Sequence, residues 1–223
     1  MSYAFSDQQS KLSLLLGDSN TSTDDAFPLA NRKKELNRGE IRFARDTKAI
    51  REYATGTVSG NTITVPTDWM ETYVLTIADE VVTNDKEVSL EDYERYHDDT
   101  GEYYHYLWEV SGTKYITFFN SSANGQTYKL WYFKKPTTEL SADADVSLLP
   151  EEYREAPVYY AAAQLLKQVG KVSLAQTYMN EYAAFVSQAT QDLEKHYIRK
   201  EYARPDFGAE DESSDRQGNG WIG

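Results

Sequence analysis

The order of the local sequence patterns most constrains what this chain can fold into. Helical patterns occupy the first and last parts of the chain, and an aromatic-rich pattern typical of β-strands occupies the middle. Because amphipathic elements must bury their apolar faces, the helices from the two ends are expected to pack on each other. We therefore predict an α+β fold, with a helical body at residues 1–54 and 137–202 and an inserted antiparallel β sub-domain at residues 55–136.

Two helices are predicted in the N-terminal part. Ser6-Asp7-Gln8-Gln9 has the form of a capping box, which predicts a helix that runs to about Leu16 and stops at Gly17. A polar loop follows, and Pro28 is expected in the first turn of a second helix that ends near Arg45. Apolar residues recur near helical spacing in the second helix, so one face is predicted to be buried. They are Leu29, Leu36, Phe43 and Ala44, with Ile41 beside them.

From Ala54 the pattern changes to one typical of strands. Residues 57–65 alternate polar and branched apolar side chains around Gly60-Asn61, which predicts a hairpin that Pro66 closes. Ser89 and the acidic residues after it predict a short helix at residues 89–96. The other strands, rich in β-branched and aromatic residues, are expected at residues 74–77, 104–110, 113–119 and 127–133.

A pair of helices is predicted after the polar linker at residues 137–147. Pro150 is expected to begin the first, and Pro157 predicts a kink or a short first helix, since an interior proline costs about 3 kcal/mol. Gly170 ends this helix, and Ser173 with Gln176 forms a second capping box that begins a last long helix. The predicted buried residues are Leu149, Tyr153, Ala156, Tyr160, Ala163 and Leu166, followed by Ala175, Tyr178, Tyr182, Phe185, Ala189 and Leu193.

Beyond Tyr202 the sequence becomes polar and acidic, so it cannot offset the entropy of ordering by burying apolar surface. Residues 203–223 are therefore expected to form a flexible, extended C-terminal tail. Two large apolar residues, Trp221 and Ile222, lie near its end. This is a common form for a docking peptide, and a chance terminus is the alternative interpretation.

The charge of the chain limits its partners. The formal net charge is −13 over 223 residues, which argues against electrostatic binding to nucleic-acid phosphates. Acidity either keeps the protein soluble or lets DNA pass without sticking. The chain has no cysteine, and no apolar stretch approaches the roughly 18 residues of a membrane span, so we expect cytosolic production and no membrane partner.

The sequence shows no arrangement that is typical of a reaction centre. His97, His105 and His196 lack metal-ligand spacing, and the acidic pairs Asp24-Asp25 and Glu151-Glu152 are explained by helix N-termini. Asp98-Asp99 is a further adjacent pair, and Asp143 with Asp145 resembles a calcium loop only loosely. We therefore expect no enzyme activity and no catalytic, cofactor-binding or metal-binding residue.

Aromatic residues gather in the predicted β sub-domain. Tyr104, Tyr106, Trp108 and Trp131 are expected to share one small sheet with other aromatic residues, where they could form a surface that stacks on sugars or bases. The alternative is that these side chains pack against the sheet's own core and its neighbours. The remaining aromatic residues of the group are Tyr103, Tyr115, Phe118, Phe119 and Phe133.

Four segments carry a resemblance to a known family. They are Leu36-Asn37-Arg38-Gly39, then Ile63-Thr64-Val65-Pro66-Thr67-Asp68-Trp69, then Leu130-Trp131-Tyr132 before Leu140-Ser141, and lastly Leu149-Pro150-Glu151-Glu152-Tyr153 with Tyr159-Tyr160-Ala161-Ala162-Ala163. In this order, across about residues 24–195, the chain resembles the adaptor, or head-tail connector, family of tailed bacteriophages. Pro157 departs from the apolar residue expected in the helix of that family.

The resemblance implies a structural virion protein of the phage neck, made in the host cytoplasm. Such a protein forms a homo-oligomeric ring, expected to be dodecameric, beneath the portal protein, and it contacts a downstream tail or neck protein. DNA passes through the ring without sequence-specific binding. The tail is expected to dock on the portal through Arg204, Pro205, Phe207, Trp221 and Ile222. A host-recognition or carbohydrate-binding module that uses the aromatic surface is the alternative function.

Overall fold

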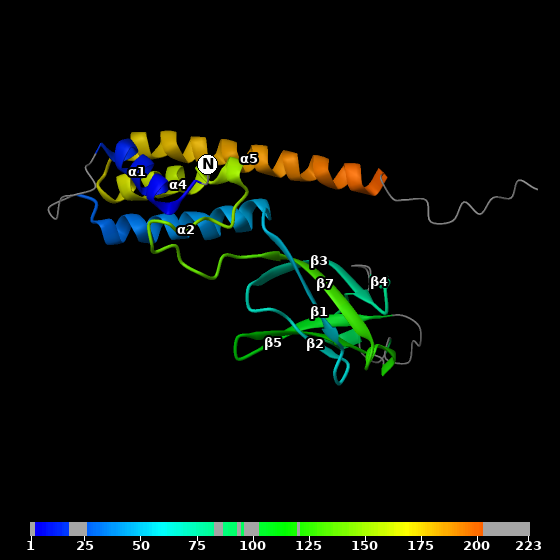
Figure 1. The fold of residues 1–223 in the computed structure, drawn as a ribbon. Coiled ribbons are helices and arrows are strands. Elements are labelled where there is room, and N and C mark those ends of the chain that lie inside the picture. The colour runs from blue at the N-terminus through cyan, green and yellow to red at the C-terminus, as the bar shows by residue number, and fades with distance from the viewer. Residues whose placement is uncertain are drawn as a thin grey trace, which may run out of the picture.

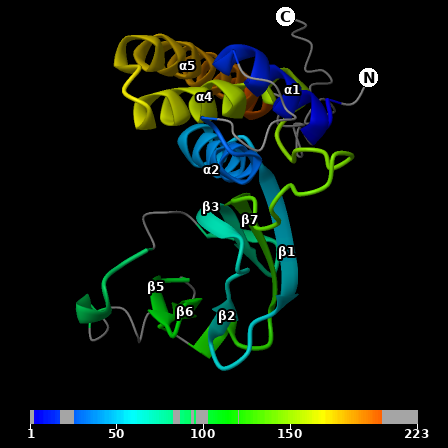
Figure 2. The same ribbon diagram turned by 90° about the vertical axis from the view of Figure 1, so that its left-hand side faces the viewer.

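The structure is a computed structural model that describes residues 3–17, 26–82, 87–92, 95, 103–119 and 121–202, with side chains up to residue 193. Helices from both ends of the described chain form one layer, and the strands form a second part on one side of it (Figure 1). A view along the helices shows the helix α2, Leu29–Thr47, between the rest of the helical layer and the strands (Figure 2). The predicted α+β class is confirmed.

The two N-terminal helices are α1, Phe5–Leu16, and α2, Leu29–Thr47. Gly17 ends α1 in the left-handed conformation with φ of 67°, as predicted. The predicted cap is wrong, because Ser6 lies inside α1 and the Asp7 carboxylate accepts the Ala4 backbone N–H at 2.8 Å instead. Pro28 precedes α2 with an extended ψ of 141° and is not its first helical residue.

The C-terminal pair consists of α4, Ala156–Gln168, and α5, Val172–Tyr202. Residues Glu151–Tyr153 form a separate 3₁₀ turn ahead of α4, which confirms the short first helix predicted from Pro157. Pro157 lies in the first turn of α4, where its missing N–H leaves no helical hydrogen bond unmade. The second predicted capping box is wrong, since α5 already begins at Val172 and Ser173 lies within it.

Most of the predicted apolar faces are buried between the helices. Leu36, Phe43 and Ala44 of α2 are fully buried, but Leu29 and Ile41 are 45% and 42% exposed. Leu29 is the first residue of α2, and Ile41 lies toward the linker that returns from the strands. Of the residues predicted for the C-terminal pair, Tyr160, Tyr178, Phe185 and Leu193 are half-buried and the others are buried.

The strands form two antiparallel sheets. Their strands are β1 Arg51–Thr57, β2 Thr62–Thr64, β3 Trp69–Ile77, β4 Glu80–Val82, β5 His105–Val110, β6 Thr113–Phe118 and β7 Thr127–Lys134. One sheet has the order β1-β7-β3-β4 and the other has the order β2-β6-β5. Strand β1 begins ahead of the boundary expected at residue 55, and β4 was not predicted.

The predicted Gly60-Asn61 turn is present, with positive φ at both residues and a bridge between Ser59 and Thr62. The predicted hairpin is nevertheless wrong, because β1 pairs with β7 and β2 pairs with β6. The turn thus passes the chain from one sheet to the other. Of the predicted helix at residues 89–96, Leu90–Asp92 forms a 3₁₀ turn, and most of the rest lies outside the described residues.

An apolar core lies between the two sheets. It includes Ile63 of β2, Leu75 of β3, Ile116 of β6 and Leu130 of β7, all of them buried. The helical layer has its own two clusters, one around Phe5 and Val158 and the other around Phe43 and Tyr182. Each part therefore buries a core of its own, as the separation of the two sequence patterns implies.

Candidate assembly surfaces

The residues predicted to dock on the portal lie outside the described residues. Arg204, Pro205, Phe207, Trp221 and Ile222 all follow the last described residue, Tyr202, which ends α5. The role of the tail therefore stays a prediction. The structure gives the position of the C-terminal end of α5, the helix that precedes the tail.

The predicted aromatic surface is divided between two sheets. Trp131 belongs to β7 in the four-stranded sheet, whereas Tyr106 and Trp108 belong to β5 in the three-stranded sheet and Tyr104 immediately precedes β5. The expectation of one shared sheet was wrong, because the chain alternates between sheets after the Gly60-Asn61 turn. Tyr104, Tyr106 and Trp131 are half-buried.

Trp108 is the most exposed of the four, with 39% of its surface accessible. Its ring stacks on Tyr115 of β6 at a centroid distance of 4.9 Å, and its Nε1 donates to Thr117 Oγ1 at 2.8 Å. Cross-strand stacking of this kind stabilises a sheet and also leaves the outer ring face open. Sugar binding by the four aromatic residues remains a prediction.

The described residues offer little acid-base chemistry. His105 is buried on β5, and burial lowers the pKa of its imidazole below the ordinary value. Its Nδ1 lies 3.2 Å from the Tyr103 carbonyl oxygen. His97 lies outside the described residues, and His196 lies on α5 beyond the described side chains. Within the described part of the chain, no group of three or more His, Asp or Glu residues could hold a metal ion.

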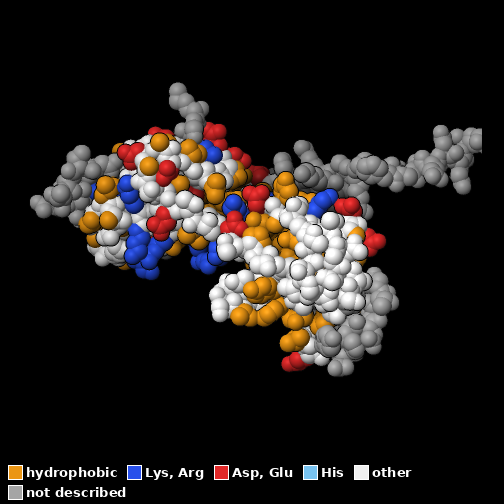
Figure 3. Space-filling model, turned by 60° about the horizontal axis from the view of Figure 1, so that its bottom comes forward, with side chains coloured by type: hydrophobic (Ala, Val, Ile, Leu, Met, Phe, Trp, Pro, Cys, Tyr) orange, Lys and Arg blue, Asp and Glu red, His pale blue; other side chains and the backbone are white. Residues whose placement is uncertain are grey.

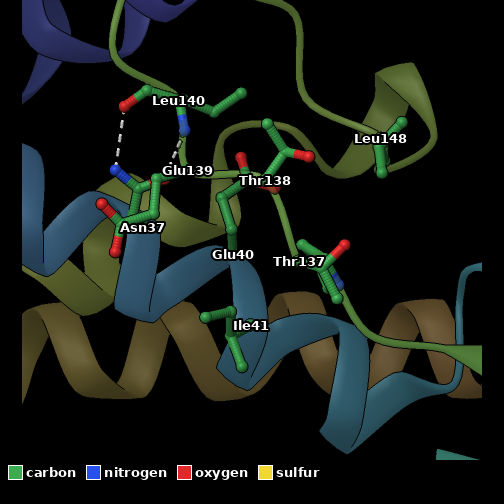
Figure 4. Close-up of a pocket in the computed structure, with 9 residues that line it drawn as sticks. Asn37, Glu40, Ile41, Thr137, Thr138, Glu139, Leu140 and Leu148 are labelled. Atoms are coloured by element: carbon green, nitrogen blue, oxygen red, sulfur yellow. Dashed lines mark hydrogen bonds between the residues drawn. The ribbon is translucent and has the colours of Figure 1, made fainter. Parts of the chain in front are cut away.

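The linker returning from the strands crosses α2 and encloses a small cavity of about 100 Å³ (Figure 4). Small-molecule sites usually measure about 300–1,000 Å³, so this cavity is smaller than a typical substrate site. Asn37 and Glu40 of α2 line it together with Leu140 and Leu148 of the returning segment. The polar groups of this junction hold the linker in place.

Asn37 fixes the linker to α2 through its side-chain amide. Its Oδ1 accepts the Leu140 backbone N–H at 2.7 Å, and its Nδ2 donates to the Leu140 carbonyl oxygen at 2.9 Å (Figure 4). One turn earlier, Lys33 Nζ donates to the Ser141 carbonyl oxygen at 2.8 Å. The segment around Leu36-Asn37-Arg38-Gly39 therefore meets Leu140-Ser141, two of the segments that carry the family resemblance.

Glu40 lies at the centre of a buried polar network. Its carboxylate accepts Gln8 Nε2 of α1 at 2.8 Å and Ser147 Oγ of the linker at 2.6 Å. Ser147 Oγ also accepts the Leu149 backbone N–H at 3.0 Å, and Arg154 Nε donates to the Leu149 carbonyl oxygen at 2.9 Å. Burial raises the pKa of Glu40 above its ordinary value, while these donors oppose the shift. The network joins α1, α2 and the Leu149–Tyr153 segment.

The other resemblance segments meet in the β part. The Tyr132 hydroxyl donates to Asp68 Oδ1 at 3.0 Å, and Lys134 Nζ lies 3.3 Å from Asp68 Oδ2. Asp68 also accepts the Lys135 N–H at 2.8 Å through its backbone carbonyl. The segment that ends in Asp68-Trp69 and the segment Leu130-Trp131-Tyr132 are thus neighbours in space.

Sequence reasoning missed the buried polar residues Gln8, Arg32 and Glu40. Arg32 Nε donates to the Phe27 carbonyl oxygen at 2.6 Å, and its guanidinium reaches Ser13 Oγ at 3.0 Å. The spacing of α2 contained a signal, since Glu40 lies four residues from both Leu36 and Ala44, two residues of the predicted buried face. A charged residue at such a position needs partners from other segments.

No described helix has the length and apolar character required to cross a membrane.

Comparison with known proteins identifies the family of this chain. A search of curated proteins gives no match. The family model of the SU10 adaptor protein matches residues 4–205, which include both the helical layer and the β part. The chain therefore belongs to the SU10 adaptor protein family, a family of phage head-tail adaptors.

Proposed function

We propose that this chain assembles as a ring, expected to be dodecameric, beneath the portal protein and continues the DNA channel toward the tail. Membership of the adaptor family makes the chain a structural protein of the head-tail connection in the phage virion. The ring, the channel and the portal contact are the further steps of the proposal. The downstream tail or neck protein is the second expected partner.

The observation that carries the proposal is the length and position of α5. At 1.5 Å per residue, its 31 residues extend about 46 Å, whereas the 13 residues of α4 extend about 20 Å. The C-terminal part of α5 projects beyond the ends of α2 and α4 (Figure 1). The tail thus departs from the far end of a long helix, well placed to contact a neighbouring protein.

We propose that the tail docks on the portal through Arg204, Pro205, Phe207, Trp221 and Ile222. The family match ends at residue 205, so the greater part of this segment lies beyond it. The support is physical: a polar chain with a few large apolar side chains gains its buried surface from a partner and not from itself.

The exposed side of α5 supports the proposed DNA channel. Between residues 176 and 191, its exposed positions carry small or uncharged polar side chains, with Glu181 as the charged residue. They include Thr177, Asn180, Ala184 and Ser187. A helix side without Lys or Arg at these positions offers phosphates no cation to hold them, so DNA could slide past it.

Electron microscopy of the full chain mixed with the portal from the same genome tests this function. An added ring stacked on the portal, with matching rotational symmetry, is the expected result. Portal alone provides the control for ring height in side views. Bare portal rings beside monomeric chains would contradict the proposal and favour the alternative, in which the aromatic surface around Trp108 binds host glycans.

A further inference from the structure

Charge is distributed unevenly over this acidic protein. Helix α2 carries six basic residues and three acidic ones, although the whole chain has a formal net charge of −13. Two of the three acids, Glu35 and Glu40, are buried. The space-filling view shows Lys and Arg side chains gathered along the underside of the helical layer (Figure 3). The basic residues of α2 are Arg32, Lys33, Lys34, Arg38, Arg42 and Arg45.

Four of these residues form an exposed stripe, which we call the basic face. Lys34, Arg38, Arg42 and Arg45 recur at the spacing of one helix side, and Arg38, Arg42 and Arg45 have 56%, 48% and 61% of their side chains exposed. Arg38 pairs with Glu35, and Arg42 and Arg45 lie near Asp46. Four cations against two acids leave the basic face with a net positive charge.

The segment that packs against a different side of α2 carries acidic residues. There Lys33 and Asn37 bind the linker at residues 137–147, which we call the return segment. It contains Glu139, Asp143 and Asp145, of which Glu139 and Asp143 are exposed. The Ser141 and Ala142 backbone N–H groups donate to Asp145 and lower the pKa of its carboxyl below the ordinary value, which favours the charged form. The molecule thus presents a basic side and an acidic side around one helix.

The separation of charge could allow identical copies of the chain to contact one another. Identical copies with a net charge of −13 repel one another, so a contact between them needs local opposite charges. A two-fold contact centred on the basic face would place that face against itself, whereas a head-to-tail contact places it against the acidic side of the next copy. Head-to-tail contacts that repeat around an axis close into a ring. DNA is the less suitable occupant, because the surrounding acidic surface repels phosphates.

We propose that the basic face of α2 in one copy binds the acidic return segment of the next copy. This inference rests on the proposed ring and assigns one of its subunit contacts. Its partner is a second copy of this chain. In a ring, the charge pattern then also gives the contact a direction, since the basic face of each copy meets the acidic return segment of the next.

Charge reversal tests the contact in the full chain mixed with portal. The variant Lys34→Glu with Arg45→Glu reverses two exposed basic residues, of which Arg45 lies 4.0 Å from Asp46 Oδ1. Lys167→Glu with Lys171→Glu, at exposed positions near the junction of α4 and α5, is the matched control because it changes the net charge equally. We expect ring occupancy on portal to fall about tenfold or more for the first variant and to stay unchanged for the control.

A compensating variant makes the test specific. Adding Glu139→Lys and Asp143→Lys to the α2 reversal restores unlike charges across the contact, so we expect ring occupancy to recover. Circular dichroism of each variant checks that it is folded. Normal rings from the α2 reversal, or no recovery in the combined variant, would overturn this contact and leave the proposed ring standing. Wild-type chain that adds no ring to portal would instead refute the proposed function.

Discussion

Gly39 of α2 lies directly against Pro157 of α4. A Cβ atom added to Gly39 would lie 2.8 Å from the Pro157 carbonyl oxygen and 2.9 Å from its Cα. Both contacts are with backbone, which cannot move aside as a flexible side chain would. The proline that departs from the family pattern therefore lies in the first turn of α4 at a close approach to α2, and a glycine on α2 makes room for it.

Gly39→Ala should destabilise the protein despite the better helix propensity of alanine. Alanine gains about 1 kcal/mol over glycine in an open helix, but overpacking of this kind costs about 1–3 kcal/mol and forces the helices apart. We expect a lower midpoint in urea denaturation. Asn31→Ala, at an exposed position of the same helix, is the control. A Gly39→Ala variant as stable as the control would show that the helices separate without cost.

Glu40 should make stability depend on pH. Its folded pKa is raised by burial, so the folded state holds the proton more tightly than the unfolded state does. Stability from this group is therefore greatest below the ordinary glutamate value, about 4.3, and falls as pH rises through the raised pKa. Across that window the unfolding free energy of wild type should therefore fall relative to that of Glu40→Gln, whose amide does not titrate. Glu139→Gln, at an exposed position, provides the control.

Asn37→Ala should release the return segment from α2. The change removes two hydrogen bonds to Leu140, which together contribute about 1–3 kcal/mol. Hydrogen exchange followed by mass spectrometry should show faster exchange at residues 137–147, while the peptides of β5 and β6 keep their rates. Unchanged exchange at Leu140 would mean that Lys33 and the Glu40 network suffice to hold the linker.

Deletion of residues 204–223 should leave a folded protein that no longer attaches to portal. The helical layer and the β part bury their own cores without this segment, so the thermal midpoint should be retained. Co-sedimentation with portal measures attachment. Trp221→Ala with Ile222→Ala in the full chain should reproduce most of the loss. Normal attachment of the truncated chain would refute the docking role of the tail.

The sequence was sufficient to predict the helical ends, the β middle and the effect of Pro157, because these depend on local periodicity and on the backbone limits of proline. It was not sufficient to assign strands to sheets. Gly60-Asn61 determines a tight turn, but the choice between β2 joining β1 or β6 depends on long-range pairing that no local pattern encodes. This choice also decided where Trp131 and Trp108 lie.

The candidate surfaces were predictable to different degrees. The polar junction around Asn37 and Glu40 depends on contacts between residues more than 100 positions apart, which spacing along one helix cannot reveal. The basic face of α2 was not predicted from composition, because the whole chain has a formal net charge of −13. Burial of Glu35 and Glu40 removes acids from the surface of α2, whereas Lys34, Arg38, Arg42 and Arg45 stay exposed, so the surface charge emerges only with the fold.

The β part enters and leaves the helical body through two strands that lie side by side. Arg51 of β1 stands opposite Phe133 of β7, and the Lys134 N–H donates to the Ile50 carbonyl oxygen at 2.9 Å. The roughly eighty residues from β1 to β7 therefore leave and rejoin the helical layer at one position, as a short loop between two helices would. The sheets can therefore be enlarged, shortened or exchanged while the helices keep their packing, so that one adaptor scaffold can carry different β modules.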